Sequence, residues 1–248
     1  MIKKAIVLAI VMIMTAAMPS FAQTLTLTTG EWAPYTSSSM DGKGVFTEIV
    51  TAVFNEMGKR PDVKFYPWKR CESMVGNGKA FAAFPYVITE ERKAKFAFSD
   101  TVMASREMFF YYGDRLNGVE WQTLTDLKSY KIGGTIGYHY EETFKAAGLD
   151  MDYNPKETAS IKKLQAGRVD LFPVDELVGR QLIKSIFPEE ADKFKTLAKP
   201  NTATDLRLMV NKNDAGAIAT LEAFNKALAA IKANGAYQAI LKKYGLTQ

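Results

Sequence analysis

Arg92 is the side chain whose position in this sequence most clearly indicates binding chemistry. It lies in the segment Phe-Pro-Tyr-Val-Ile-Thr-Glu-Glu-Arg-Lys-Ala-Lys-Phe-Ala-Phe-Ser-Asp, residues 84–100. Thr89 is expected to cap a short helix with two glutamates and Arg92 in its first turn, where the helix dipole disfavours a cation. Arg92 therefore needs an anion, and its guanidinium can hold a carboxylate through two parallel hydrogen bonds. A surface ion pair with either glutamate or with Asp100 is the alternative.

Aromatic side chains are concentrated where predicted strands end and the chain turns away from the sheet. Rings and guanidinium groups at such points could enclose a small ligand with an apolar body and an acidic group. Aromatic residues at strand or helix spacing more often belong to a protein core, and that alternative stays open here. The candidate ligand-binding residues of this group are Trp32, Trp68, Arg70, Tyr86 and Arg92.

A glycine-rich segment at residues 133–137 offers a second place for an anion. It follows a predicted strand and precedes a predicted helix, but its sequence, Gly-Gly-Thr-Ile-Gly, does not match the dinucleotide-binding pattern. The free N–H groups of the helix start, at residues 137–140, could bind a carboxylate, and Tyr138 and His139 lie there. A tight turn for close packing is the structural alternative.

The residue types that enzymes and metal sites need are scarce in this chain. His139 is its one histidine, which excludes a two-histidine metal site and the His-Glu-x-x-His motif. No Gly-x-Ser-x-Gly motif occurs, and no close carboxylate pair stands out as an acid/base couple. Cys71 is the one cysteine, so we expect a buried thiol, with a reactive thiol as the alternative. We therefore expect no catalytic residues, no metal and no cofactor.

Residues 1–22 have the pattern of a cleaved secretory signal peptide. Lys3 and Lys4 precede a short apolar run, and Ser20-Phe21-Ala22 provides the small residues before a cleavage site. The apolar run is shorter than the ~20 residues of a membrane-spanning helix. We expect export to the periplasm and a mature chain that begins at Gln23.

Length and charge set only broad limits on the rest of the protein. The chain of 248 residues can bury a sizeable core in one large domain or two small ones. Its formal net charge is +5, but the basic residues are scattered rather than gathered with aromatic ones. Nucleic-acid binding is therefore not predicted.

The elements that must position the candidate residues alternate between strand and helix. Besides the short helix after Thr89, helices are predicted at 45–57, 69–75, 139–147, 158–166, 176–186 and 215–233, with a short terminal helix after them. Strands are predicted at 24–29, 63–66, 80–86, 108–112, 131–135, 169–174 and 206–210. This alternation predicts an α/β protein with mainly parallel sheets.

Two distant segments share one pattern. Gly78-Lys79 leads into a predicted strand that ends in Phe84-Pro85-Tyr86, and Gly167-Arg168 leads into one that ends in Phe172-Pro173-Val174-Asp175. Ligands of open α/β sheets bind at the carboxyl ends of the strands. A repeat of this kind would fit a protein of two lobes in which the strand ends of both lobes face one cleft.

An ordered set of motifs extends over residues 24–245. Its most specific part is Thr-x-x-Arg followed by Phe-Ser-Asp, in residues 89–100. The other motifs are Glu31-Trp32-Ala33-Pro34-Tyr35, Gly44 to Gly58, Gly134 to Gly137, Gly167-Arg168-Val169-Asp170 with Asp175, and Asn234-Gly235 before Tyr244-Gly245. In this order they resemble the bacterial periplasmic solute-binding proteins of family 3, the polar amino-acid type that supplies ABC transporters.

The resemblance implies a type II periplasmic binding protein fold, in which two α/β lobes joined by two crossover strands close on a ligand. It implies a first lobe at residues 23–105 and 205–248 and a second lobe at 106–204. By the resemblance, Arg92 would bind the ligand's carboxylate, Asp175 its amino group and Trp32 its side chain. The helix start near Tyr138 and His139 would add contacts to the carboxylate.

The sequence departs from the family pattern around the implied site. Phe84-Pro85-Tyr86-Val87 replaces small hydroxyl residues, Tyr138-His139 stands where threonine is common, and Ala80 stands where an acidic residue is usual. We therefore expect a tight, apolar cleft and an amino-acid-like or small carboxylated ligand rather than a standard polar amino acid.

The function that these features favour is capture of a small solute. We expect an exported, monomeric, non-enzymatic receptor that closes on its ligand and presents it to the permease of an ABC transporter. One alternative is a periplasmic lyase or dehydratase of the same fold, with His139 or Asp175 as the acid/base group. The other is a sensor whose ligand-bound state is read by a chemoreceptor or kinase.

Overall fold

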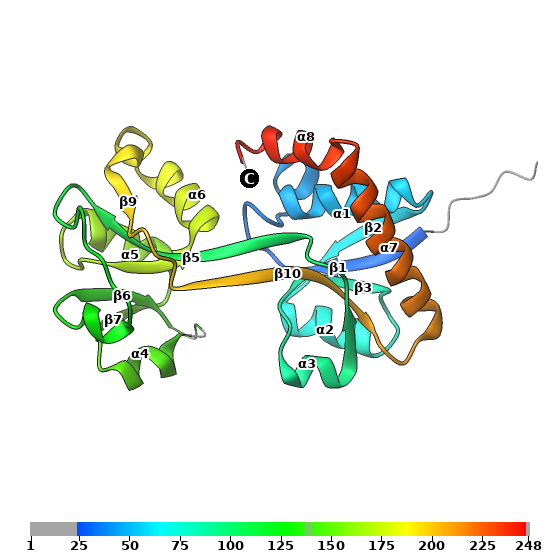
Figure 1. The fold of residues 1–248 in the computed structure, drawn as a ribbon, viewed down its shortest axis with the longest axis horizontal. Coiled ribbons are helices and arrows are strands. Elements are labelled where there is room, and N and C mark those ends of the chain that lie inside the picture. The colour runs from blue at the N-terminus through cyan, green and yellow to red at the C-terminus, as the bar shows by residue number, and fades with distance from the viewer. Residues whose placement is uncertain (1–23, 137, 139, 247–248) are drawn as a thin grey trace, which may run out of the picture.

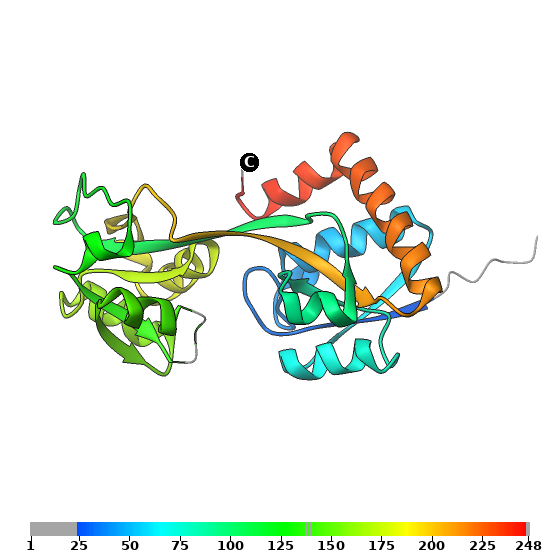
Figure 2. The ribbon, with the colours of Figure 1, turned by 60° about the horizontal axis from the view of Figure 1, so that its bottom comes forward.

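Two groups of strands and helices make up the computed structural model, which describes residues 24–136, 138 and 140–246. Two long strands, β5 (Met103–Tyr112) and β10 (Thr202–Asn211), connect the groups (Figure 1). The same two strands form the connection in the second view (Figure 2). We call the group that contains β1 lobe 1 and the group that contains β6 lobe 2.

Lobe 1 combines elements from both ends of the chain. Its strands run in the order β2-β1-β3-β10, and β4 also pairs with β10. β1 is parallel to both of its neighbours, β2 and β3. In this register Leu27 lies opposite Val63 on one side and Ala82 on the other. The elements are β1 (Thr24–Thr29), η1 (Asp41–Lys43), α1 (Val45–Glu56), β2 (Arg60–Phe65), α2 (Trp68–Gly76), β3 (Ala82–Tyr86), α3 (Glu90–Lys95), β4 (Phe96–Phe98), α7 (Ala215–Ala233) and α8 (Ala236–Lys243).

Lobe 2 is built from the middle of the chain. β6 and β7 form a parallel pair, and a bridge joins Ile132 of β6 to Leu171, just before β8. β8 and β9 pair with β5 instead. The elements are η2 (Leu124–Leu127), β6 (Lys131–Thr135), α4 (Glu141–Ala147), β7 (Asp150–Asn154), α5 (Glu157–Gln165), β8 (Phe172–Asp175), α6 (Glu176–Ile186), η3 (Pro188–Lys193) and β9 (Phe194–Thr196).

The crossing strands β5 and β10 change partners along their length. Between the lobes, residues 103–107 of β5 pair antiparallel with residues 202–206 of β10. Beyond that segment β10 pairs with β3 and β4, and β5 pairs with β8 and β9. The α/β architecture predicted from the sequence is confirmed, but the larger sheet is mixed rather than mainly parallel. Every antiparallel strand pair in the described ranges includes β5 or β10.

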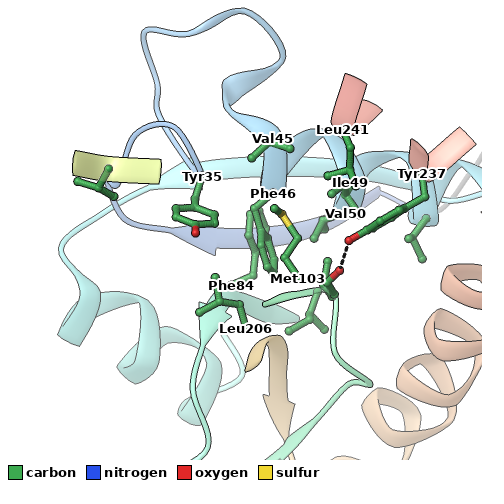
Figure 3. Packing of buried hydrophobic residues seen from close by; sticks show 14 of the residues in the cluster. Tyr35, Val45, Phe46, Ile49, Val50, Phe84, Met103, Leu206, Tyr237 and Leu241 are labelled. Carbon is green, nitrogen blue, oxygen red and sulfur yellow. Dashed lines mark hydrogen bonds between the residues drawn. The ribbon is translucent and has the colours of Figure 1, made fainter. Parts of the chain in front are cut away.

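An apolar core holds α1 against the sheet of lobe 1. Phe46 of α1 stacks on Phe84 of β3, with 5.7 Å between the ring centroids (Figure 3). At the same core the hydroxyl of Tyr237, from α8, donates to the carbonyl oxygen of Val102 at 2.9 Å. Each large apolar side chain buried in this way contributes roughly 1.5–3 kcal/mol. The sequence pattern predicts one apolar helical face from Val45 to Met57. Met57, the last residue of that face, is half-buried, and the other six are buried: Val45, Phe46, Ile49, Val50, Val53 and Phe54.

Several predicted elements differ from the structure in length. Strands predicted at 24–29 and 131–135 have those bounds, whereas those at 108–112 and 206–210 are parts of the longer β5 and β10. The added residues are mostly polar, so they have no apolar strand pattern. The short strands β4, β7 and β9 were not predicted. Cys71 is buried, as expected.

None of the helices within the described part of the chain is both long and apolar enough to span a membrane. The predicted signal peptide, residues 1–22, lies outside the described residues.

Candidate ligand-binding site

Two adjoining chambers open between the lobes, beside the crossing strands. The outer chamber has a volume of about 380 Å³ and the inner chamber about 210 Å³. Trp32, Val87, Tyr138 and Leu206 line both chambers, so the two form one cleft. A larger hollow of about 800 Å³ lies on lobe 1 alone, between α2 and α3, and its lining is mostly exposed polar residues. The interlobe cleft is therefore the better candidate for a ligand with an apolar body.

Arg92 lines the outer chamber from the first turn of α3. Thr89 caps that helix as predicted, because its hydroxyl oxygen accepts a hydrogen bond from the Arg92 backbone N–H at 3.2 Å. The guanidinium lies over the ring of Tyr86, 4.7 Å from the centroid, and donates to the Val87 carbonyl oxygen at 3.1 Å.

The ion-pair partner of Arg92 is Glu72 of α2, with 3.3 Å between Nε and Oε2. Glu90 and Glu91, the neighbours considered from the sequence, pair with Lys93 and Lys95 instead. Glu72 thus fixes one edge of the guanidinium while the group remains at the chamber wall.

Aromatic rings form half of the lining of the outer chamber. Trp32 stacks on Tyr35, with ring centroids 4.3 Å apart. Trp68 meets Tyr86 edge to face at 5.8 Å, and the Tyr86 hydroxyl donates to the Trp68 carbonyl oxygen at 2.7 Å. Burial raises the pKa of Tyr86. These rings are held by contacts within lobe 1 and present a preformed apolar surface.

Arg70 does not join them. It is exposed, its guanidinium lies 4.4 Å from the centroid of Tyr66, and it lines neither chamber. Trp68 and Arg70 are two positions apart on the short helix α2, so their side chains project in different directions.

Tyr138 brings lobe 2 to the cleft and lines both chambers. Its hydroxyl donates to the carboxylate of Glu157 at the start of α5, and burial raises the pKa of the tyrosine. The side chain is thereby tied to its own lobe. The predicted contacts of Gly137 and His139 lie outside the described residues.

Asp175 lines the inner chamber at the end of β8 and caps α6. Its Oδ1 accepts the backbone N–H groups of Leu177 and Val178 at 3.0 and 3.1 Å. Its Oδ2 accepts the hydroxyls of Ser105 at 2.5 Å and Tyr35 at 3.1 Å. Burial raises the pKa of Asp175, while these hydrogen bonds act in the opposite direction.

The crossing strands supply lining residues that sequence reasoning missed. All but Leu206, the first residue of the predicted strand 206–210, lie in the polar segments of β5 and β10 that had no strand signal. A lone glutamate before the apolar run 108–112 was the one available indication. These residues are Ser105, Glu107, Thr202, Thr204 and Leu206.

Two α/β lobes with a cleft between them, connected by two strands, have the architecture of periplasmic binding proteins. The chain belongs to the bacterial extracellular solute-binding proteins, family 3, whose family model matches residues 26–247. This is a family of extracellular, non-enzymatic solute-binding proteins. Membership confirms the resemblance read from the sequence.

Similar proteins are amino-acid-binding. The lysine/arginine/ornithine-binding periplasmic protein of Escherichia coli is 30% identical over 247 residues, covering 92% of this chain and 89% of that protein. The L-cystine-binding protein TcyJ of E. coli is 24% identical over 220 residues, covering 87% of this chain and 79% of TcyJ. A solved ancestral arginine-binding protein bound to arginine has a TM-score of 0.66 and 24% identity, covering 89% of this chain and 97% of that one.

Proposed function

We propose that this protein is a periplasmic receptor that captures an amino-acid-like carboxylate between its lobes and delivers it to an ABC transporter permease. The observation that carries the proposal is one cleft in which Arg92 and aromatic rings of lobe 1 face Tyr138 and Asp175 of lobe 2. Amino-acid binding by similar proteins supports this choice.

Each wall of the cleft has its own part in the proposed binding. Arg92 pairs with the ligand's carboxylate, since a guanidinium matches two carboxylate oxygens. The rings of Trp32, Trp68, Tyr86 and Tyr138 enclose its apolar portion. Asp175, in the inner chamber, accepts hydrogen bonds from the ligand's positively charged group.

The proposed mechanism of capture is rotation of the lobes about β5 and β10. We assign residues 23–105 and 205–248 to lobe 1 and residues 106–204 to lobe 2. Ligand contacts from both lobes favour the closed arrangement, because a ligand shifts an equilibrium by its differential affinity for the two states. The closed, monomeric receptor is then the form that a permease distinguishes from the open one, after export and removal of residues 1–22.

A binding screen tests the proposal. Purified residues 23–248 are heated with each standard amino acid, L-cystine, simple amines and small carboxylates, and any stabilising compound is titrated by calorimetry. A ligand at 100 times its Kd is expected to add about 2.7 kcal/mol to the free energy of unfolding. Stabilisation by amines alone, or by no carboxylate, would contradict the proposal.

A further inference from the structure

The indole of Trp68 rests on a backbone position that carries no side chain. A Cβ atom placed on Gly30, directly after β1, would lie within 2.7 Å of Cδ2, Cε2 and Cζ2 of Trp68. Cδ2 and Cε2 are the two atoms that the fused rings share, so Gly30 contacts a face of the indole rather than its edge. Carbon atoms in van der Waals contact are about 3.5–4.0 Å apart. Only glycine therefore leaves room for the ring in this place.

The backbone on both sides of this contact is held by hydrogen bonds. The Gly30 carbonyl oxygen accepts the hydroxyl of Thr36, a fully buried residue, at 2.7 Å. At the start of α2, the Trp68 carbonyl oxygen accepts the hydroxyl of Tyr86, also at 2.7 Å. A side chain at position 30 would therefore displace the indole rather than the chain, because rotation about the side-chain bonds of Trp68 leaves both hydrogen bonds in place.

The backbone conformation of Gly30 does not itself require glycine. Its φ is not positive, unlike that of Gly42 and Gly44 in the following loop. An alanine could adopt the same backbone conformation without strain. What position 30 lacks is space on the side of Trp68, so a substitution there reports on the contact with the ring.

The indole separates this backbone position from the space for a ligand. Trp68 lines the outer chamber, whereas Gly30 lines neither chamber. To restore van der Waals contact with an added Cβ atom, the ring would have to move away from residue 30 by about 1 Å. That movement would reduce the depth of a chamber of only about 380 Å³.

We infer that Gly30 determines how large a ligand this cleft accepts, because it lets Trp68 lie against the backbone and so sets the depth of the outer chamber. This rests on the proposed function. Gly30 is a positioning residue, since it acts through Trp68 and does not line the chamber itself. An added methyl group at position 30 selects for smaller ligands, and loss of the indole admits larger ones.

The test compares four variants with wild type: Gly30→Ala, Trp68→Leu, the two changes combined, and Gly76→Ala. Gly76, at the end of α2, is the matched control, because a Cβ atom there would make ordinary contact with Phe96 at 3.7 Å and Gly76 lines neither chamber. The standard amino acids and L-cystine are titrated into each protein by calorimetry, and thermal unfolding is measured in parallel. Crystal structures of wild type and Gly30→Ala, grown without amino acid, locate the indole.

Gly30→Ala is expected to weaken binding of the largest amino acid that wild type accepts by at least about tenfold, and of smaller ones by less, as for a methylene group that no longer fits a pocket. Its indole should lie about 1 Å farther from residue 30. Gly76→Ala should keep the wild-type Kd values. The combined variant should match Trp68→Leu in Kd values and unfolding temperature, because alanine at position 30 no longer meets a ring. That comparison decides the matter if Gly30→Ala alone does not fold.

Four results would overturn the inference. They are an indole that keeps its place in Gly30→Ala, equal weakening of large and small amino acids, early unfolding of Gly30→Ala with wild-type Kd values, and a combined variant that differs from Trp68→Leu. Each leaves capture of a ligand between the lobes intact. Failure of wild type to bind any of these amino acids would overturn the inference and count against the proposed function as well.

Discussion

Arg92 and Glu72 illustrate how single residues prepare this cleft for a ligand. The ion pair at 3.3 Å and the Tyr86 ring beneath the guanidinium restrict the long arginine side chain to one place. A pair of this kind on a partly exposed surface adds little to stability, commonly 0–1 kcal/mol. In the proposed binding its value lies in orientation, because a guanidinium that is already fixed loses less entropy when a carboxylate binds.

Removal of the Arg92 guanidinium tests this role. We expect Arg92→Ala to weaken binding of the best carboxylate from the screen by about 2–5 kcal/mol, a factor of about 30 to several thousand in Kd. Arg92→Lys should also weaken binding, since lysine lacks the planar fork. Arg70→Ala is the matched control, as Arg70 lies outside the cleft. If Arg92→Ala binds the carboxylate normally but unfolds at a lower temperature, Arg92 is part of a structural ion pair and does not bind the ligand.

Tryptophan fluorescence reports on the rings of the cleft. Trp32 and Trp68 line the outer chamber, whereas Trp121 is buried in lobe 2. We expect the compound selected by the screen to change the emission of wild type, and expect a smaller change in Trp32→Phe and in Trp68→Phe. Trp121→Phe should keep the full change. If the variants lose stability but keep the full fluorescence change, Trp32 and Trp68 are core residues that do not contact the ligand.

At the scale of elements, the start of α6 connects a helix cap with the cleft. Asp175 caps α6 through two backbone N–H groups and accepts two hydroxyls from outside the helix. Asp214 caps α7 more simply, through one bond from the Ala217 backbone N–H at 3.0 Å. Asp214 therefore serves only as a helix cap, whereas Asp175 is a helix cap that also connects the two lobes. Comparing variants of the two residues distinguishes these contributions.

Alanine substitutions at the two caps should differ. Loss of an aspartate cap typically costs about 1 kcal/mol, and we expect this for Asp214→Ala. Asp175→Ala should cost more, about 2–3 kcal/mol, because the buried Tyr35 hydroxyl and the half-buried Ser105 hydroxyl also lose their acceptor. Denaturant unfolding measures both. Equal losses would mean that the bonds from Tyr35 and Ser105 contribute nothing measurable.

At the scale of the whole molecule, the hydrogen bond from Tyr35 to Asp175 joins lobe 1 to lobe 2 across the cleft. Tyr35 is 1% exposed and stacks on Trp32, so its hydroxyl is held toward the opposite lobe. In the proposed closure the lobes rotate about the crossing strands, and this bond favours the arrangement in which the lobes meet.

Deletion of that hydroxyl should shift the balance between open and closed arrangements. We expect Tyr35→Phe to increase the radius of gyration in solution scattering, because the closed arrangement loses a buried interlobe hydrogen bond worth about 1 kcal/mol. Tyr237→Phe removes a buried hydroxyl bond within lobe 1 and should leave the radius unchanged. A scattering profile of Tyr35→Phe identical to that of wild type would contradict the prediction.

The sequence by itself determined the alternation of strands and helices, the buried face of α1 and the capping of α3 by Thr89, because these depend on neighbours within a few residues. Its ordered motifs also identified the family. The tertiary structure decided what depends on distant contacts. Glu72 reaches Arg92 only when α2 and α3 lie together, and Arg70 turns away from the cleft. Glu107 lies opposite Asp175 only because of the register between β5 and β8. The polar segment of β5 that contains Glu107 has no apolar pattern from which a strand could be predicted. Local propensity fixes an element, but the partners of a charged side chain are set by the packing of elements that are far apart in the chain.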